Sequence, residues 1–220
     1  MKTLHLTLTT ITTVMLITAC GGGNDEAAAT SETPSTTTTT NPTPTGCASA
    51  PITSTGYSLV FKSCNVAGVA EYYDKTECVR DNASGLIWEG KPASGIRSST
   101  NVYTNYDDIT TQQKSVGVSP SQSEVEANSN SVGYKNSVNN QALCGFNNWR
   151  MPLKIELQGI QQINGKADVN WFPNTVSSFY WSMSLTPSLP ANLAIVVNFN
   201  NGGFGDFGRE TQHSVRLVRQ

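Results

Sequence analysis

Residues 77–91 read ECVRDNASGLIWEGK and lie at the start of the predicted domain of residues 77–220. Two strand-like runs, 77–80 and 86–88, flank the segment Asp81-Asn82-Ala83-Ser84-Gly85. Asp, Asn, Ser and Gly accept the backbone angles and local hydrogen bonds of tight turns. The stretch therefore predicts two strands separated by a turn.

Further strands are expected on both sides of this stretch. One precedes it at 57–62, with the sequence YSLVFK, and three follow at 179–185, 193–199 and 214–219. All four runs are rich in aromatic and β-branched residues, which favour pleated sheets. The sequence NFNNGGFGDFG, residues 198–208, is predicted to form a glycine-rich turn between the last two strands.

Two helices are predicted in the middle of the chain. Residues 131–143 form the first, and residues 153–163 form the second, in which apolar side chains recur on one face. Residues 92–130 are rich in Ser, Asn, Thr and Gln and are predicted to form a long surface excursion. The fold class expected from this pattern is α+β: a single compact domain with a mixed, mostly antiparallel sheet and two helices.

The N-terminal segment is predicted to be a signal peptide of residues 1–19. Lys2 provides positive charge, and the apolar stretch that follows is shorter than the ~20 residues needed to span a bilayer. The sequence Ile17-Thr18-Ala19-Cys20 is similar to a bacterial lipobox, in which the cysteine thiol accepts a diacylglycerol. Cys20 is therefore expected to carry lipid, including an N-linked chain such as palmitate, and to anchor the protein stably in a membrane.

Residues 20–46 are expected to form a disordered tether. Gly, Thr, Ser and Pro dominate this segment, so it has too little apolar surface to offset the entropy of folding. Residues 47–76 are predicted to form an N-terminal strand region joined to a domain at 77–220. Gly21 follows the cysteine, and by similarity to known lipoproteins this favours an outer-membrane location, facing outward or into the periplasm.

The charge balance of the folded part is neutral. From residue 47 onward there are 13 Lys and Arg residues and 13 Asp and Glu residues. A nucleic-acid-binding protein usually carries a basic excess, so no nucleic-acid partner is expected.

Four cysteines follow position 20: Cys47, Cys64, Cys78 and Cys144. An even number of cysteines in an exported chain predicts disulfides, and three connectivities are open. We favour Cys47–Cys64 together with Cys78–Cys144. A zinc site is not expected, because the chain has no CxxC motif and His213 is the only histidine after the signal peptide.

Four stretches together resemble a known family. They are ECVRDNASGLIWEGK (77–91), ALCGFNNWRMPLKIEL (142–157), WFPNTVSSFYWSMSLTP (171–187), and VNFNNG (197–202) with the closing VRLVR (215–219). Their order and spacing resemble the C-terminal domain of the Legionella collagen-like adhesin, the Lcl C-terminal domain family. The likeness covers residues 78–219.

This resemblance implies a C-type-lectin-like domain and, by analogy with the adhesin, binding to sulfated polysaccharide. It also implies that Cys78 and Cys144 are disulfide partners. The family pattern places Thr after the proline, where its hydroxyl caps the next helix, but this chain has Leu153. We therefore expect the second helix to begin by packing or with help from Asn147 or Asn148.

Candidate ligand contacts come from aromatic and arginine side chains. Flat apolar rings suit the C–H faces of sugars. Trp88, Trp149 and Trp181 lie in strand or helix-entry motifs and are predicted to be core residues. The candidate contacts are therefore Trp171, Phe204 and Phe207, with Arg209 as a contact for an anionic group.

No metal or cofactor site is expected. The turn at 198–209 has oxygen-bearing side chains, but Arg209 occupies the position where an EF-hand needs Glu. The chain has no GxSxG elbow and no phosphate loop. The sequence thus favours a lipid-anchored binding module over an enzyme, with a polysaccharide as its partner, or alternatively another envelope protein.

Overall fold

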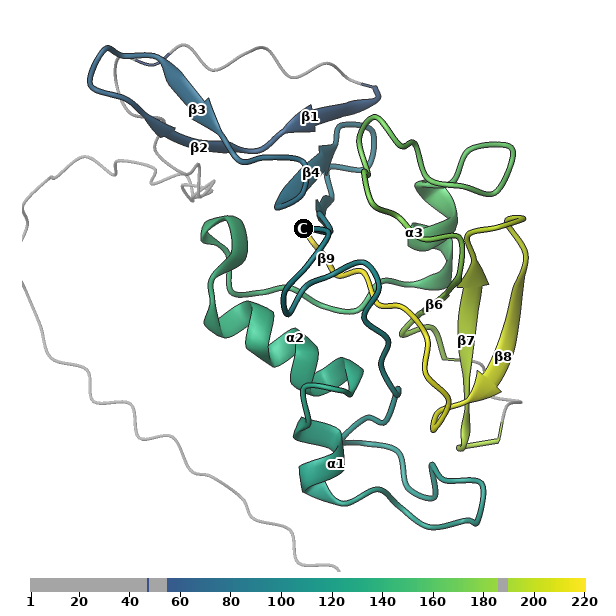
Figure 1. Cartoon of the computed structure of the whole chain (residues 1–220). Coiled ribbons are helices and arrows are strands. Elements are labelled where there is room, and N and C mark those ends of the chain that lie inside the picture. The colour runs from purple at the N-terminus through teal and green to yellow at the C-terminus, as the bar shows by residue number, and fades with distance from the viewer. Residues whose placement is uncertain (1–46, 48–54, 186–189) are drawn as a thin grey trace, which may run out of the picture. The chain divides into compact units, whose positions relative to one another are not determined.

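The two strands predicted within residues 77–91 form an antiparallel pair, β4 (Cys78–Asp81) and β5 (Ile87–Glu89) (Figure 1). The computed structural model describes residue 47 and residues 55–185 and 190–220. The turn between the strands closes as expected. The Gly85 N–H donates to the Asp81 carbonyl at 2.9 Å, and Gly85 has a φ of 75°, a left-handed angle that favours glycine.

This pair is the centre of a four-stranded antiparallel sheet with the order β1–β4–β5–β9. β1 (Tyr57–Leu59) lies beside β4, and the C-terminal β9 (Val218–Arg219) lies beside β5. The strand predicted at 214–219 is therefore too long. Its first residues leave this sheet because Ser214 bridges to Tyr180 instead.

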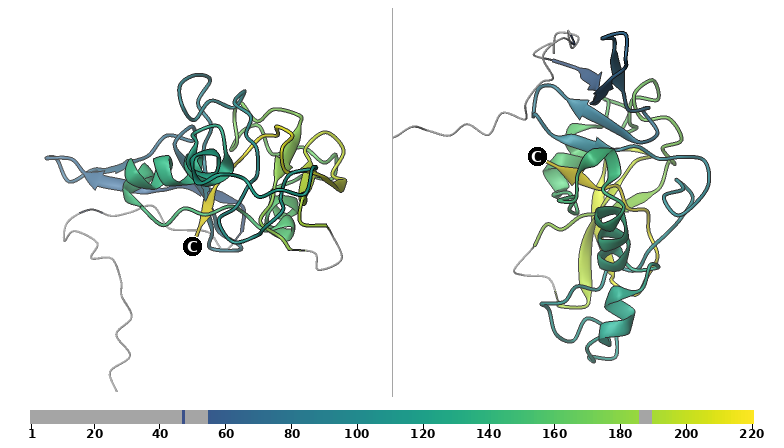
Figure 2. Two further views of the ribbon diagram at one scale, coloured as in Figure 1. Left: turned by 90° about the horizontal axis from the view of Figure 1, so that it is seen from below. Right: turned by 90° about the vertical axis from the view of Figure 1, so that its left-hand side faces the viewer.

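The single strand predicted at 57–62 is wrong, because the chain changes sheets at Val60. β2 (Phe61–Cys64) pairs with β3 (Ala70–Tyr72) in a separate two-stranded sheet. The Val60 side chain is buried, and its carbonyl accepts the Tyr73 N–H. Figure 2 shows the β2–β3 hairpin extending away from the body of the described domain.

A three-stranded antiparallel sheet with the order β6–β7–β8 is formed near the C-terminus. β6 (Phe179–Trp181) and β7 (Leu193–Asn198) match predicted strands, although β6 is shorter. The glycine-rich turn predicted at 198–208 is wrong, because β8 (Phe204–Gly208) pairs with β7 along its length. The turn itself is confined to the residues between these two strands.

The described residues contain three α-helices and a short 3-10 helix, η1 (Leu143–Gly145), instead of the two predicted helices. α2 (Ser131–Asn140) begins at the predicted residue but ends before the predicted residue 143. α3 (Lys154–Gly159) is shorter than the predicted 153–163, and Ile163 is exposed although it was predicted on the apolar face. The unpredicted helix is α1 (Gln122–Glu126), which begins with a capping box between Ser121 and Glu124.

Residues 92–130 are only partly a surface excursion. They are mainly irregular, but Tyr103 and Tyr106 are buried in the domain. The buried Asn130 side chain accepts the Tyr106 N–H at 2.8 Å and donates to the Tyr106 carbonyl at 3.0 Å. Such bonds satisfy backbone groups that no regular element pairs, so this irregular segment can pack against the core.

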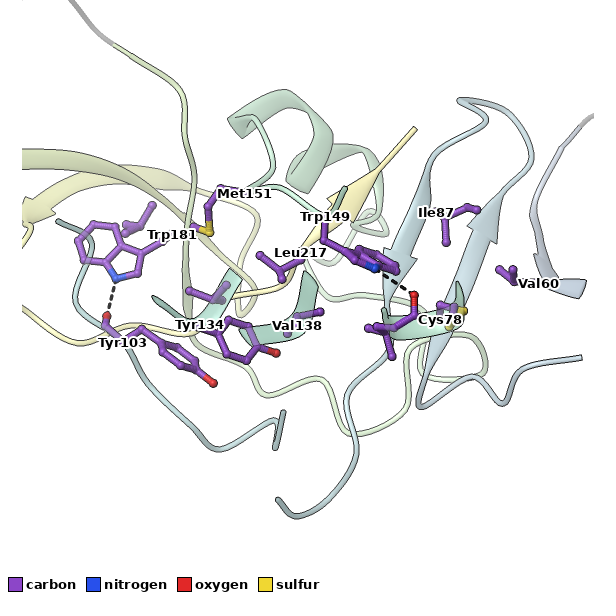
Figure 3. Packing of buried hydrophobic residues seen from close by; sticks show 14 of the residues in the cluster. Val60, Cys78, Ile87, Tyr103, Tyr134, Val138, Trp149, Met151, Trp181 and Leu217 are labelled. Carbon is purple, nitrogen blue, oxygen red and sulfur yellow. Dashed lines mark hydrogen bonds between the residues drawn. A yellow bond between two sulfur atoms is a disulfide. The ribbon is translucent and has the colours of Figure 1, made fainter. Parts of the chain in front are cut away.

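Two hydrophobic clusters form the core. The Trp149–Trp181 cluster consists of Val60, Cys78, Ile87, Tyr103, Tyr134, Val138, Leu143, Cys144, Trp149, Met151, Trp181, Ala194, Val196, Val215 and Leu217. The Trp88–Phe172 cluster consists of Val79, Trp88, Leu157, Ile160, Ala167, Phe172, Tyr180, Val197, Phe199 and Val218. All three tryptophans assigned to the core by their sequence context are therefore buried. Figure 3 shows the Trp181 indole N–H donating to the Tyr103 carbonyl, a bond of 2.7 Å that joins the 92–130 segment to β6.

The favoured disulfide pairing is confirmed, with Cys47–Cys64 and Cys78–Cys144 bonded. The second bond joins β4 to η1 across 66 residues of sequence. The predicted signal peptide (1–19), the lipidated Cys20 and the tether (20–46) lie outside the described residues. Within the part that is described, no helix is long and apolar enough to cross a membrane.

Candidate binding surface

Phe204 is the most exposed aromatic side chain among the predicted contacts. It is the first residue of β8, and 59% of its surface is accessible. The Lys154 ammonium lies 4.0 Å from the centre of its ring. A cation at this distance is attracted to the negative face of the ring, so one face is held by Lys154.

Lys154 reaches Phe204 because of how α3 begins. Leu153 has no side-chain acceptor, and the Ser184 hydroxyl accepts the Lys154 N–H at 2.7 Å instead. The Glu156 carboxylate accepts the Leu153 N–H at 2.7 Å, which supplies one half of a capping box. The expected help from Asn147 or Asn148 is wrong, because the cap comes from the chain that follows β6.

The ion pair between Arg150 and Glu156 steadies the same helix start. The guanidinium donates to the two carboxylate oxygens at 2.6 and 2.8 Å, a bidentate arrangement. The neighbouring carboxylate raises the pKa of Arg150, while partial burial opposes this effect.

Exposed apolar side chains surround this helix start. Leu153 and Met183 are both exposed, and the Met183 N–H donates to the Pro152 carbonyl at 2.8 Å, which holds the two segments together. Leu185, two residues further along, is also exposed. Exposed apolar side chains therefore lie at the helix start that carries Lys154.

Trp171 is half-buried and has a similar arrangement. Lys75 lies over its ring at 4.9 Å from the centre and donates to the Asn170 carbonyl at 2.8 Å. The Tyr57 ring lies 6.1 Å from Trp171, and both rings border the Trp88–Phe172 cluster. Trp171 is thus both a packing residue and a partly accessible ring.

A contact between two glycines joins the segments that carry these rings. A Cβ on Gly165 would lie only 2.1 Å from the Gly202 nitrogen, so the backbones touch. The Gln161 side chain donates to the carbonyls of Gly165 and Asn198, at 2.9 and 3.0 Å. Phe204 pairs with Val197, a member of the cluster that Trp171 borders. We call the half-exposed and exposed residues Trp171, Lys75, Phe204 and Lys154 the aromatic surface.

Phe207 faces the other side of β8. Its half-buried ring lies 4.9 Å from Phe179 and 4.7 Å from His213 and packs against the Trp149–Trp181 cluster. Burial lowers the pKa of His213, whose imidazole lies within hydrogen-bonding distance of the Thr211 hydroxyl, at 3.1 Å. Phe207 and Phe204 therefore do not belong to one surface.

Arg209 is directed into the domain and is 8% exposed. Its guanidinium lies 3.1 Å from the Asp107 carboxylate and donates to the carbonyls of Asn105 and Ala191. Burial lowers its pKa, and Asp107 partly offsets that effect. These contacts tie β8 to the 92–130 segment, and we define the aromatic surface without Arg209.

A buried ionic network was not predicted from the sequence. Lys91, which is 2% exposed, lies 2.9 Å from the fully buried Glu89 carboxylate and donates to the Tyr134 hydroxyl at 2.8 Å. The Tyr134 hydroxyl also donates to Glu89. Glu89 further accepts the Leu217 N–H at 2.9 Å, and Arg216 donates to the Glu89 carbonyl at 2.6 Å.

Burial dominates the protonation of this network. It lowers the pKa of Lys91 to about 8, although the Glu89 carboxylate acts in the opposite direction. Burial, together with the nearby Glu89 charge, raises the pKa of Tyr134 well above its usual value. Each charged or polar group here has a partner from another part of the chain, so the network links β5, α2 and the C-terminal segment. The only sequence signal for this buried network was that Glu89 and Lys91 alternate with apolar neighbours.

Among the described residues, no group of three His, Cys, Asp or Glu side chains could hold a metal ion. Of the predicted contact residues, Phe204 and Trp171 are accessible rings, Phe207 is a packed ring, and Arg209 forms an internal ion pair. The lysines over the rings were missed, because they come from distant segments.

Comparison with protein families adds an identity to this geometry. The model of the Lcl C-terminal domain matches residues 77–219, from the residue before β4 to the end of β9. None of the curated proteins compared with the chain matches it. Because the match spans well over half of the sequence, the chain belongs to the Lcl C-terminal domain family.

Proposed function

We propose that this chain is a lipid-anchored protein of the cell envelope whose domain is an adhesin-related module that binds polysaccharide through the aromatic surface. The observation that carries the proposal is the pairing of an accessible ring with a lysine at both Phe204 and Trp171. Rings provide apolar faces for sugar C–H groups, and lysines provide donors for hydroxyl or acidic oxygens. The C-type-lectin-like fold implied by the resemblance is part of this proposal.

The family membership supports a binding role over an enzymatic one. Its model covers almost the whole folded region, and membership of the Lcl C-terminal domain family suggests an adhesin-related module. The charged groups best shielded from water are Glu89, Lys91 and Arg216, and all three have partners inside the domain. A role in binding therefore accounts for the accessible groups, and no enzymatic activity is proposed.

Binding to immobilised glycans tests the proposal. Phe204→Ala removes an exposed ring and should weaken binding without altering thermal unfolding, whereas Ile109→Ala, at an exposed apolar side chain on another loop, should leave binding unchanged. Trp171→Ala should weaken binding and also lower stability, because this ring packs on Tyr57. Absence of binding to neutral, acidic and sulfated glycans alike would refute the polysaccharide proposal.

The lipid anchor is tested separately. Mass analysis of the exported protein should show a chain that begins at Cys20 and carries acyl groups, and Cys20→Ser should abolish them. Protease shaving of intact cells then distinguishes an outward-facing domain from one that faces the periplasm.

A second candidate is an assembly role with another envelope protein as partner. The exposed Leu153, Met183 and Leu185 favour it, because these apolar side chains come from two segments joined by the Met183–Pro152 bond and would be covered in a protein interface. A photo-crosslinking residue at Met183 should then yield one abundant adduct in intact cells. A single adduct together with no glycan binding would favour this role.

A further inference from the structure

Two arginines lie on the same face of the four-stranded sheet, on either side of one apolar residue. Arg80 in β4 pairs with Ile87 in β5, and Ile87 pairs with Arg219 in β9. Directly paired residues of antiparallel strands point to the same face. Adjacent strands are about 4.8 Å apart, so the two Cα atoms are separated by about 10 Å, and the long side chains can meet above Ile87.

Neither arginine has an acidic side chain as a partner within the described residues. Arg80 makes no hydrogen bond or ion pair there, and its Nε is shielded from water without a partner. The Nε of Arg219 is in the same state, and its Nη2 donates to the Gln220 main-chain oxygen. Burial, followed by the charge of Arg80, lowers the pKa of Arg219. The two groups thus repel each other across Ile87.

Aromatic side chains hold this part of the sheet face. The Arg219 guanidinium lies 3.9 Å from the centre of the Phe146 ring. Next to Phe146, Gly145 lies close to the Tyr73 hydroxyl, and Lys62 lies over the Tyr73 ring at 5.5 Å. Guanidinium stacking on a ring leaves the edge of the group free to donate, and in Arg219 the Nη1 donors remain beside the Nη2 that bonds Gln220. The ring of Phe146 therefore orients Arg219.

The nearest acidic side chains do not neutralise the pair. Asp81 belongs to the opposite face of the sheet, because it pairs with Tyr57, which contacts Phe172 of the Trp88–Phe172 cluster. Glu89 shares the face of Ile87, but its carboxylate is already paired with Lys91 at 2.9 Å. Counted over side chains alone, this face therefore has an excess of positive charge in a domain that is neutral overall.

We propose that Arg80 and Arg219 form a binding site for a phosphate monoester, on the sheet face opposite the aromatic surface. The site is separate from Trp171 and Phe204, and the inference does not depend on the proposed polysaccharide function. Both guanidinium groups donate to one phosphate, whose apolar substituent lies toward Phe146. The phosphate accepts from the Nη donors of both guanidinium groups, since their Nε atoms are shielded within the protein.

Charge matching selects a phosphate monoester over other anions. Two arginines carry two positive charges, and a phosphate monoester carries close to two negative charges at neutral pH, with three acceptor oxygens. A sulfate monoester or a carboxylate carries only one negative charge. Bidentate guanidinium bonds to phosphate are also among the stronger hydrogen bonds of proteins.

The site is tested by titrating the folded chain with methyl phosphate. Binding is followed by the NMR chemical shifts of the arginine side chains and of the β4 and β9 amides. Methyl phosphate should bind, methyl sulfate and acetate should bind more weakly, and methyl phosphate binding should fall below pH ~6, where its second proton returns. Arg80→Gln and Arg219→Gln should each weaken binding about tenfold or more. Lys166→Gln removes an exposed charge elsewhere and should leave binding unchanged.

The Arg80→Lys variant guards the test against a folding defect. It keeps the positive charge but loses the planar guanidinium fork, so it should bind methyl phosphate with intermediate affinity. A hexose phosphate and phosphatidylcholine vesicles with phosphatidic acid then identify the source of the phosphate. Equal binding of methyl sulfate, or methyl phosphate binding that survives both Gln variants, would overturn the assignment. Glycan binding by the Arg80→Gln variant should be unchanged, so failure here and failure of the proposed function are distinguishable.

Discussion

The Ser184 hydroxyl accepts the Lys154 N–H at 2.7 Å, across 30 positions of sequence. The first turn of a helix has N–H groups without intrahelical partners, and Leu153 at the cap position cannot accept one. A hydroxyl from the chain that follows β6 therefore accepts an N–H that a capping residue usually satisfies. The same residue, Lys154, also contacts the Phe204 ring.

Ser184→Ala should lower the free energy of unfolding by about 1 kcal/mol, the usual effect of losing a helix cap. Urea unfolding measures this change. Leu153→Thr should restore most of the stability in the Ser184→Ala background, because it supplies a local acceptor, and should change the wild-type chain little. An equal loss with and without Thr at this position would show that Ser184 acts by packing alone.

Lys91→Met should destabilise the domain by about 3–5 kcal/mol, because it leaves the buried Glu89 carboxylate without its cation. The Lys91→Met/Glu89→Gln pair should lose less than the sum of the two single changes, since no unpaired charge remains. A double-mutant cycle in urea measures this coupling. Additive losses would contradict the network.

The contribution of Lys91 should make the free energy of unfolding rise with pH above about 8. The folded pKa of Lys91 is lowered to about 8, whereas the unfolded chain holds this proton up to the ordinary value of 10.5. The unfolded state thus binds more protons between these values, and the slope approaches 1.4 kcal/mol per pH unit at most. Near pH 10 the raised pKa of Tyr57, about 12, begins to act in the opposite direction. Unfolding curves from pH 7 to 10 should lose this rise in Lys91→Met.

Acid should weaken the start of α1. The Lys114 ammonium, 2.7 Å away, and then the Ser121 N–H lower the pKa of Glu124 to about 2. This stabilisation is complete above pH 4.5 and is lost as the pH falls toward 2. Glu124→Gln should flatten the acid limb of the stability curve, and amide exchange in 121–126 should locate the effect. Lys166→Gln serves as the control.

Loss of the Cys78–Cys144 bond should lower stability by about 4 kcal/mol in the chain-entropy model, because the bond closes a long loop. The double change to Ala avoids an unpaired thiol. Loss of Cys47–Cys64, which spans 17 positions, should have a smaller effect. Thermal unfolding of the two double variants ranks the bonds, and the reverse order would contradict the loop-length argument.

The parts of the fold that were predictable depend on local chemistry. Residues 81–85 carry the side chains of a turn, and the predicted hairpin strands and α2 formed where expected. β8 was missed because its glycines indicate a turn, whereas pairing with the apolar β7 keeps it extended. α1 could have been found, since Ser121 and Glu124 have capping-box spacing.

The candidate site was less predictable for the same reason. Phe204 next to glycine was correctly expected to be exposed. The sequence could not show that Lys154 covers its ring, nor that Arg209 turns inward to Asp107, because both depend on contacts between distant segments. Arg80 and Arg219 meet only through strand register across β5.

The Cys47–Cys64 bond also determines how mechanical load would enter the domain. A pull on the chain before residue 47 passes through two sulfur atoms directly to β2 and bypasses residues 48–63. The force therefore reaches the β2–β3 hairpin where Cys64 pairs with Ala70. The β2–β3 hairpin is therefore the first element to bear shear when the N-terminal side of the chain and a partner bound to the domain are pulled apart.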